Sequence, residues 1–453
     1  MYDFGPLAAQ DDKELMGYFH TTKQVKLLFA EDEKTPNCIF VTRPGGGKTA
    51  LVKWLKSKTI NNRPLIFIQP SHTQLVPLDD DLNLEDHRIL IYFELYTGIV
   101  SELIQRKALP NALQKKCQTY MLEEWGKTIK RFFSDKFTGM SILGCGFMLD
   151  ASNRRSYLGY IKRTQKLDKV SDLMCQISEQ VSPIVVSDDP EAMVTKGLDE
   201  LSYENSLRIG AYLSVLTHLH SLGCQVLLFI KEHVLQSVLE HYSDSSHFED
   251  RIEGIQWTEE DLMDMLNLRL STRLKKKWED VFAIERGKFQ QKVFSHLING
   301  PRDLLFICNS AGKSGEKITH ISLLRIVDTL RNSKWNEIRK QFGRQWPSVT
   351  EFAQTIIGVV RNKLKNGKIS RERFNTIVKA AFERPGTILH ELRTKEKWIN
   401  TCPWGIPTID ERLFFIGCLG YTFEKQKVYP WAGRSIEQFR TSRSIFVSPL
   451  FLY

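Results

Sequence analysis

The sequence predicts an α/β protein in which a parallel sheet, with helices on both faces, is followed by helical domains. Apolar runs of strand length alternate with helical stretches up to about residue 254, and one run leads through a glycine-rich loop into a helix. After residue 254 the pattern becomes mainly helical. A chain of 453 residues is longer than one ordinary domain, so more than one domain is expected. Its composition, 42% apolar and 26% charged residues, is typical of a folded protein.

Four short apolar runs are expected to form the strands of the sheet. They are CIFVTR at 38–43, PLIFIQP at 64–70, SPIVVSDD at 182–189 and QVLLFIKE at 225–232. Helices are expected over TALVKWLKSK, directly after the first run, and over SLRIGAYLSVLTHLHSL, between the last two. The segment HRILIYFELYTGIVSELIQRKAL is expected to begin as a strand and to continue as a long helix. Because strands that alternate with helices favour parallel pairing, these runs predict a parallel sheet.

The chain is predicted to contain three domains. Residues 1–254 form the core, with a mostly polar helical insertion over about 110–181. TEEDLMDMLNLRL, which opens with a threonine and acids before an apolar-periodic run, begins a helical lid over 255–330. Residues 331–453 form a basic helical, winged-helix-like region with two candidate strands, LFFIGCLGYTF and SIFVSPLF. With no apolar run of about 18 residues and no signal-peptide pattern, a cytoplasmic protein without membrane contact is expected.

The strongest motif is the loop TRPGGGKT at residues 42–49, between a strand and a helix. Glycines let the backbone wrap an anion with its N–H groups pointing inward, and the helix N-terminus adds partial positive charge. In such loops the lysine reaches the β- and γ-phosphates and the next hydroxyl binds magnesium. Lys48 and Thr49 are therefore predicted to bind ATP and Mg²⁺. The whole predicted cofactor-binding loop is Thr42, Arg43, Pro44, Gly45, Gly46, Gly47, Lys48, Thr49 and Ala50.

The consensus GxxxxGK(S/T) has glycine where this chain has Thr42, so the motif predicts binding more directly than hydrolysis. A carboxylate is expected at the end of a neighbouring strand. We assign Asp188 to Mg²⁺, and Asp189 or Glu191 to orienting the attacking water. The sequence GLDEL at 197–201 is a rival position, although no apolar strand precedes it, and a plain acidic turn after the strand is the structural alternative.

Two cations are further candidates. Lys231, at the end of the run 225–232, is placed to sense the γ-phosphate, unless it is simply a solvent-exposed residue at a strand end. Arg302 follows Gly-Pro at a helix start in INGPRDLLFICNSA, where it can close over the nucleotide with a lid or be an ordinary helix-start arginine. Arg251 and Arg269 are both possible arginine fingers, and the sequence does not select between them.

These features together resemble bacterial P-loop ATPases of the AAA-like and STAND class, kin to origin-recognition-type initiator ATPases. The phosphate loop, the acidic strand, Lys231, the helix sequence IQWTEEDLMDMLNLRL and the element GPRDLL occur in that family's order, over most of residues 1–360. The resemblance implies a P-loop ATPase that hydrolyses ATP as a conformational switch or motor, in anti-phage defence or in nucleic-acid transactions. It also implies self-association or an effector protein as partner. The family more usually has arginine or asparagine in place of Lys231, and Asp-Glu in place of Ser-Asp-Asp.

Positive charge is concentrated in one region. Residues 331–397 hold 16 Lys+Arg against 6 Asp+Glu, an excess that equals the net charge of +10 of the whole chain. A local basic surface suggests a nucleic-acid partner, with a solvated helical face as the alternative. Two further hypotheses follow: a nucleic-acid-binding module, or a catalytically weak scaffold that uses the fold for partner assembly. Trp398, Trp404 and Trp431 are expected to pack in the core rather than to stack on bases.

Overall fold

The protein, described from a computed structural model, forms two compact units. The described residues are 1–28, 38–43, 45–58, 63–68, 83–121, 158–159, 161–162, 165–190, 203–244, 251–344, 346–365, 367–401, 408–423, 426–432 and 436–452. We call the unit made of Met1–Lys26, Thr42–Trp54 and Gly254–Tyr453 the loop unit, because it contains the glycine-rich loop. The other, made of Leu27–Val41 and Leu55–Glu253, is the sheet unit.

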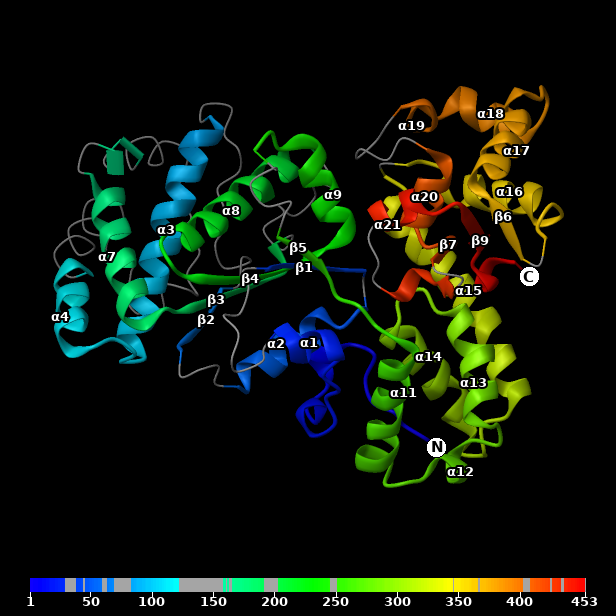
Figure 1. The fold of residues 1–453 in the computed structure, drawn as a ribbon, viewed down its shortest axis with the longest axis horizontal. Helices are drawn as coiled ribbons and strands as arrows, with labels where there is room; N and C mark the ends of the chain where they lie inside the picture. Colours follow the sequence, from blue (N-terminus) through cyan, green and yellow to red (C-terminus); the bar gives the residue numbers. More distant parts are fainter. Residues whose placement is uncertain are drawn as a thin grey trace, which may run out of the picture. The chain divides into compact units, whose positions relative to one another are not determined.

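The sheet unit is built on a five-stranded sheet with the order β2-β3-β4-β1-β5 (Figure 1). The strands are β1 (Cys38–Thr42), β2 (Leu65–Ile68), β3 (Ile184–Asp188), β4 (Gln225–Lys231) and β5 (Ile252–Gly254). β2 pairs in parallel with β3, and β3 in parallel with β4. The four strands predicted from apolar runs are confirmed. β5 was not predicted, because it has only three residues, none of them fully buried.

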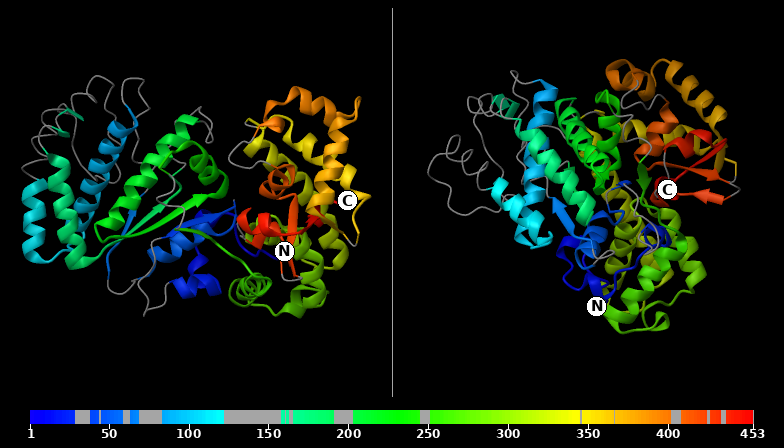
Figure 2. Two further views of the ribbon diagram at one scale, coloured as in Figure 1. Left: turned by 45° about the horizontal axis from the view of Figure 1, so that its top comes forward. Right: turned by 60° about the vertical axis from the view of Figure 1, so that its left-hand side comes forward.

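Helices cover the sheet, which confirms the α/β class. The helices of the sheet unit are α3 (Leu84–Gln105), α4 (Asn111–Tyr120), α7 (Lys166–Val181), α8 (Tyr203–Ser221) and α9 (Glu232–His241). α3, α8 and α9 contact strands, and α4 and α7 pack against α3. α3 packs against α7 and α8, and Figures 1 and 2 show α3 and α8 along one face of the sheet. Ile184, Val185 and Val186 of β3 are all at most 1% exposed. Because successive strand side chains face opposite sides of a sheet, both faces are covered at β3.

The prediction that HRILIYFELY begins as a strand is wrong, since α3 is helical from Leu84 onward. The Asn83 side chain accepts a hydrogen bond from the Asp86 backbone N–H at 2.8 Å, and so caps the helix. Glu85 and Asp86 occupy the first turn, where negative charge is favourable. These polar signals at the start of the segment outweigh the β-favouring run that follows it.

The loop unit is mainly helical. Its elements before residue 320 are η1 (Ala9–Asp11), η2 (Leu15–Gly17), α1 (Lys23–Leu28), α2 (Lys48–Lys56), α11 (Glu259–Leu268), the π-helical turn η6 (Arg269–Leu274), α12 (Trp278–Val281), α13 (Arg286–Val293), η7 (Phe294–His296), α14 (Pro301–Ala311) and η8 (Gly312–Ser314). α11 begins where the sequence predicts it, because Thr258 and Asp261 form a reciprocal capping box. Among the described residues, no helix combines the length and the apolar character needed to cross a bilayer.

The C-terminal part of the loop unit combines helices with a second sheet. The helical elements are α15 (His320–Phe342), α16 (Val349–Arg361), α17 (Arg371–Glu383), α18 (Ile388–Lys395), α19 (Lys397–Asn400), α20 (Ile409–Phe415), η10 (Pro430–Ala432), α21 (Ile436–Thr441) and η11 (Pro449–Phe451). The strands β6 (Lys368–Ser370), β7 (Leu419–Phe423), β8 (Gln426–Val428) and β9 (Ser444–Val447) pair antiparallel in the order β6-β9-β7-β8. The two predicted strands are confirmed in part: LFFIGCLGYTF is a strand only from Leu419, since Leu413–Phe415 belong to α20, and SIFVSPLF only as far as Val447. The two strands pair with each other.

The C-terminal tryptophans pack as expected where they are described. Trp398 stacks on Trp346 with ring centroids 5.2 Å apart, and the Trp431 indole N–H donates to the Phe294 carbonyl at 2.9 Å. Both predicted side chains are buried. Trp404 lies outside the described residues.

Candidate functional site

The glycine-rich loop connects β1 to α2 and has a backbone that only glycine fits. Gly45 and Gly47 have φ values of +85° and +101°, in the left-handed region that strains other residues. A Cβ atom at Gly45 would lie 2.7 Å from Cβ of Arg302, and one at Gly46 would lie 1.8 Å from Oγ1 of Thr42. The three glycines therefore form a closely packed turn in which a larger residue would not fit.

Trp257 packs against this loop. Its indole N–H donates to the Gly46 carbonyl at 2.9 Å, and a Cβ atom at Gly47 would lie 3.3 Å from its ring. This hydrogen bond fixes the orientation of the Gly46 carbonyl. Trp257 is a site residue that the motif analysis missed: it was noted only within the sequence that precedes α11.

The start of α11 supports Trp257. Asp261 accepts hydrogen bonds from the Thr258 side chain at 2.7 Å and from its backbone N–H at 3.1 Å, and it lies 3.1 Å from Nε2 of His20. Burial raises the pKa of Asp261, but the hydrogen bonds from Thr258 and His20 outweigh burial and hold the pKa below its ordinary value. A carboxylate therefore fixes the first turn of α11 immediately after the tryptophan.

Arg302 lies against the loop. It is the second residue of α14, and its Cβ, Cδ and Nε are the atoms closest to the Cβ position at Gly45. The side chain is half-buried, and we find no hydrogen bond or ion pair of its guanidinium in the described part of the chain. An arginine with its stem packed and its charge unused is available to an anionic ligand.

A buried ion pair fixes the helix start that carries Arg302. Asp303 accepts hydrogen bonds from the backbone N–H groups of Ile298 and Asn299, both at 2.9 Å, and its other oxygen lies 2.7 Å from Nζ of Lys334. Lys334 also contacts Glu337 at 2.6 Å. Burial lowers the pKa of Lys334, but the two carboxylates outweigh it and raise the pKa above the ordinary value.

The remaining predicted loop residues differ in their surroundings. Lys48 is 9% exposed, and Thr49 and Ala50 are half-buried in the first turn of α2. Arg43 donates from Nη2 to the Phe414 carbonyl at 2.8 Å, with its guanidinium 5.4 Å from the Phe414 ring, so it anchors the loop to α20. Pro44 lies outside the described residues. The loop unit thus brings the loop together with Trp257 and Arg302.

The predicted residues at strand ends belong to the sheet unit. Asp188 ends β3 and Lys231 ends β4; because these strands are parallel neighbours, both side chains start from the same edge of the sheet. The Asp189 backbone N–H donates to the Phe229 carbonyl at 3.2 Å, and Asp189 has a positive φ of 58°. Glu191 and the rival sequence at 197–201 lie outside the described residues. The roles assigned to these acids and to Lys231 stay predictions.

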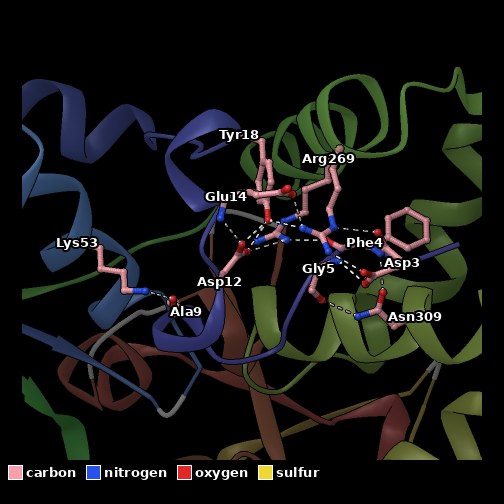
Figure 3. Close-up of polar contacts among 11 residues, drawn as sticks. Asp3, Phe4, Gly5, Ala9, Asp12, Glu14, Tyr18, Lys53, Arg269 and Asn309 are labelled. Atoms are coloured by element: carbon pink, nitrogen blue, oxygen red, sulfur yellow. Dashed lines mark hydrogen bonds and ion pairs between the residues drawn. The ribbon is translucent and has the colours of Figure 1, made fainter.

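Of the two possible arginine fingers, Arg269 is buried and contacts residues of its own chain. It is 5% exposed and donates to the Phe4 carbonyl at 2.5 Å. Figure 3 shows this hydrogen bond. Asp12 lies 3.6 Å away, and the Tyr18 ring centroid is 4.7 Å from the guanidinium carbon. A side chain enclosed in this way is not available to a neighbouring subunit.

The basic region 331–397 presents most of its charge to solvent. Twelve of its Lys and Arg residues are exposed, against four exposed acids: Arg339, Lys340, Arg344, Arg361, Lys363, Lys365, Arg373, Lys379, Arg384, Arg393, Lys395 and Lys397, against Glu351, Glu372, Glu383 and Glu391. Lys334 and Arg371 instead form ion pairs with two carboxylates each. The excess charge therefore lies on the surface of α15–α18, of their connections and of the first residue of α19.

No protein-family model matches the chain, and no curated protein matches it.

Proposed function

We propose that this chain binds ATP with Mg²⁺ at the loop 42–50 and acts as an ATP-dependent conformational switch. The observation that carries the proposal is Arg302: its stem packs on Gly45, and its guanidinium has no hydrogen bond or ion pair in the described part of the chain. A phosphate-binding loop needs a second cation of this kind to neutralise a polyphosphate.

The residue types of the loop support a nucleoside triphosphate as the ligand. Gly45 and Gly46 have no room for a Cβ atom, because the side chains of Arg302 and Thr42 occupy the space. Glycine at such positions is typical of a loop whose backbone approaches phosphate oxygens. Lys48 begins α2, and the positive end of that helix dipole favours an anion at the same place. ATP is the proposed ligand because its phosphates match this set of donors, with Lys48 and Arg302 supplying the positive charge.

Mg²⁺, when bound, would reduce phosphate repulsion and polarise the terminal phosphate. The Thr49 hydroxyl is the oxygen of the loop proposed to hold it, and Asp188 is proposed from sequence as its carboxylate ligand. Asp189 or Glu191 is proposed to orient water, and Lys231 to contact the γ-phosphate. Hydrolysis, self-association and a role in defence against phage belong to this proposal through the family resemblance alone.

The first experiment is calorimetric titration of the full chain with ATP and Mg²⁺. Lys48→Ala should weaken binding by about tenfold or more, since a hydrogen bond to a charged group contributes roughly 1.5–3 kcal/mol. Lys56→Ala, on the last turn of the same helix, is the matched control and should leave the affinity unchanged. Equal affinities of Lys48→Ala and the unaltered chain would overturn the proposal. Asp188→Asn should reduce the magnesium dependence of binding.

A second candidate function is nucleic-acid binding by residues 331–397, which the twelve exposed cations against four exposed acids favour. Duplex DNA binding should be measurable at about 50 mM salt and should fall steeply as salt rises. Replacing Arg361, Lys363 and Lys365 with glutamine should weaken binding and flatten its salt dependence. An equal charge change at Lys13, Lys288 and Lys313, outside the region, is the control. Loss of binding in both triple variants alike would count against a local interface.

A further inference from the structure

The N-terminal segment, defined here as residues 1–20, contacts the four elements that carry the candidate site. These elements are α2, which follows the glycine-rich loop, the pair α11 and η6, which follows Trp257, and α14, which begins next to Arg302. All of them belong to the loop unit. The contacts are specific hydrogen bonds and ion pairs, most of which Figure 3 shows.

On α14, Asn309 binds the segment with both ends of its amide. Oδ1 accepts from the Phe4 N–H at 2.7 Å, and Nδ2 donates to the Gly5 carbonyl at 2.8 Å. The Phe4 side chain is fully buried. Gly5 has a φ of +103°, and a Cβ atom there would lie 2.4 Å from Nη1 of Arg269. The segment therefore has one permitted path between α14 and η6.

On η6, two arginines hold the same segment. Besides its bond to the Phe4 carbonyl, Arg269 lies 3.6 Å from Asp12, which accepts from the Tyr18 hydroxyl at 2.5 Å. Arg273 forms ion pairs with Asp3 at 2.6 Å and with Glu14 at 2.8 Å. Burial, followed by the hydrogen bond to Asp12, raises the pKa of Tyr18 to about 12, so its hydroxyl stays a donor.

On α2, Lys53 holds the segment from the side of the loop. Its Nζ donates to the Ala9 carbonyl at 2.6 Å and to the Gln10 carbonyl at 2.9 Å. Lys53 lies five residues after Lys48 on the same helix, so the contact restrains the helix whose first turn closes the loop. The adjacent Trp54 stacks on Phe19, with ring centroids 5.8 Å apart.

We propose that residues 1–20 are a positioning element that holds the loop, Trp257 and Arg302 in one fixed arrangement. Without the segment, α2, α11 and α14 would still have their own packing, but the cross-links through Lys53, Arg269 and Asn309 would be absent. The loop would then be less ordered before a ligand binds, and part of the binding free energy would be used to order it. The consequence for ATP affinity rests on the proposed function; the effect on loop order does not.

The test uses two variants that remove contacts to different parts of the segment, Lys53→Met, which faces Ala9 and Gln10, and Asn309→Ala, which faces Phe4 and Gly5, in the full chain. Lys53→Met keeps the aliphatic stem and removes both hydrogen bonds; Lys53→Arg should restore them. Lys13→Met, within the segment but outside these contacts, is the control. Hydrogen exchange of residues 45–54 should accelerate in both variants, including in Asn309→Ala, whose change lies on a different helix. ATP affinity should fall by roughly 2- to 30-fold.

The outcomes separate this inference from the proposed function. If the unaltered chain binds ATP and both variants match it in affinity and in exchange of 45–54, the positioning role is overturned and the nucleotide site stands. If the unaltered chain binds no ATP but exchange of 45–54 accelerates in both variants, the proposed function fails and the positioning role stands. Acceleration confined to residues near each substitution would also overturn the positioning role, because it would show only local loosening.

Discussion

Lys334 lies between two carboxylates, and removing its charge should loosen the start of α14 strongly. Its side chain is 5% exposed, and that of Asp303 is 2% exposed. Breaking a buried ion pair by removing one partner costs about 3–5 kcal/mol. In Lys334→Met, Asp303 keeps two backbone hydrogen bonds, so we expect a loss near the lower end, about 3 kcal/mol. Asp303→Ala should cost more, because it also leaves the Ile298 and Asn299 N–H groups unsatisfied.

Hydrogen exchange is the suitable assay, since a chain with two compact units need not unfold in a single transition. A local loss of about 3 kcal/mol corresponds to roughly 100-fold faster exchange in α14 and in the facing part of α15. Glu337→Gln is the control, because its side chain is 31% exposed and it should cost about 1 kcal/mol. If Lys334→Met exchanged no faster than Glu337→Gln, the reasoning about burial would be refuted.

The same pair gives a pH dependence with a definite sign. The folded-state pKa of Lys334 is raised, so its stabilisation is fully present below the unfolded-state pKa of about 10.4 and is lost as the pH rises through the folded-state value. The stabilisation of α14 by Lys334, measured by hydrogen exchange, should therefore not change between neutral pH and about pH 9. A loss of protection in that range that Lys334→Met abolishes would contradict this assignment.

The remaining predictions concern the loop and its support. Gly45→Ala should weaken ATP binding, since a positive φ costs a non-glycine residue roughly 1–2 kcal/mol and the new Cβ meets an arginine stem; Gly287→Ala, in open space, is the calorimetric control. Trp257→Phe keeps a ring but removes the bond to the loop carbonyl, so affinity should fall about fivefold, and unchanged binding would show that the bond is dispensable. The folded-state pKa of Asp261 is lowered, so its stabilisation of α11 is fully present above the unfolded-state pKa of about 3.9 and is lost as the pH falls through the folded-state pKa. Hydrogen exchange of α11 should therefore accelerate at acid pH in the unaltered chain, and this acceleration should be smaller in Asp261→Asn.

Sequence reasoning succeeded where local signals are dense. Strands β1 to β4 follow from apolar runs, and α11 follows from its capping residues. It failed at β5, β6 and β8, because three residues carry no detectable alternation. Trp257 shows the limit for the site: its hydrogen bond joins residues 211 positions apart, and no periodicity encodes such a contact. The contacts of residues 1–20 are equally nonlocal, since they depend on Arg269 and Asn309.

Arg302 shows how the fold decides what a motif residue can do. The sequence places an acid directly after it, and Asp303 might be expected to neutralise it. Successive helix residues point about 100° apart, however, and both oxygens of Asp303 are already used by Lys334 and by two backbone N–H groups. The buried acid therefore orders the helix start without neutralising the neighbouring guanidinium. Because Asp303 does not neutralise Arg302, the positive charge of Arg302 supports an anion site at the loop, and the argument does not rest only on its position after Gly-Pro.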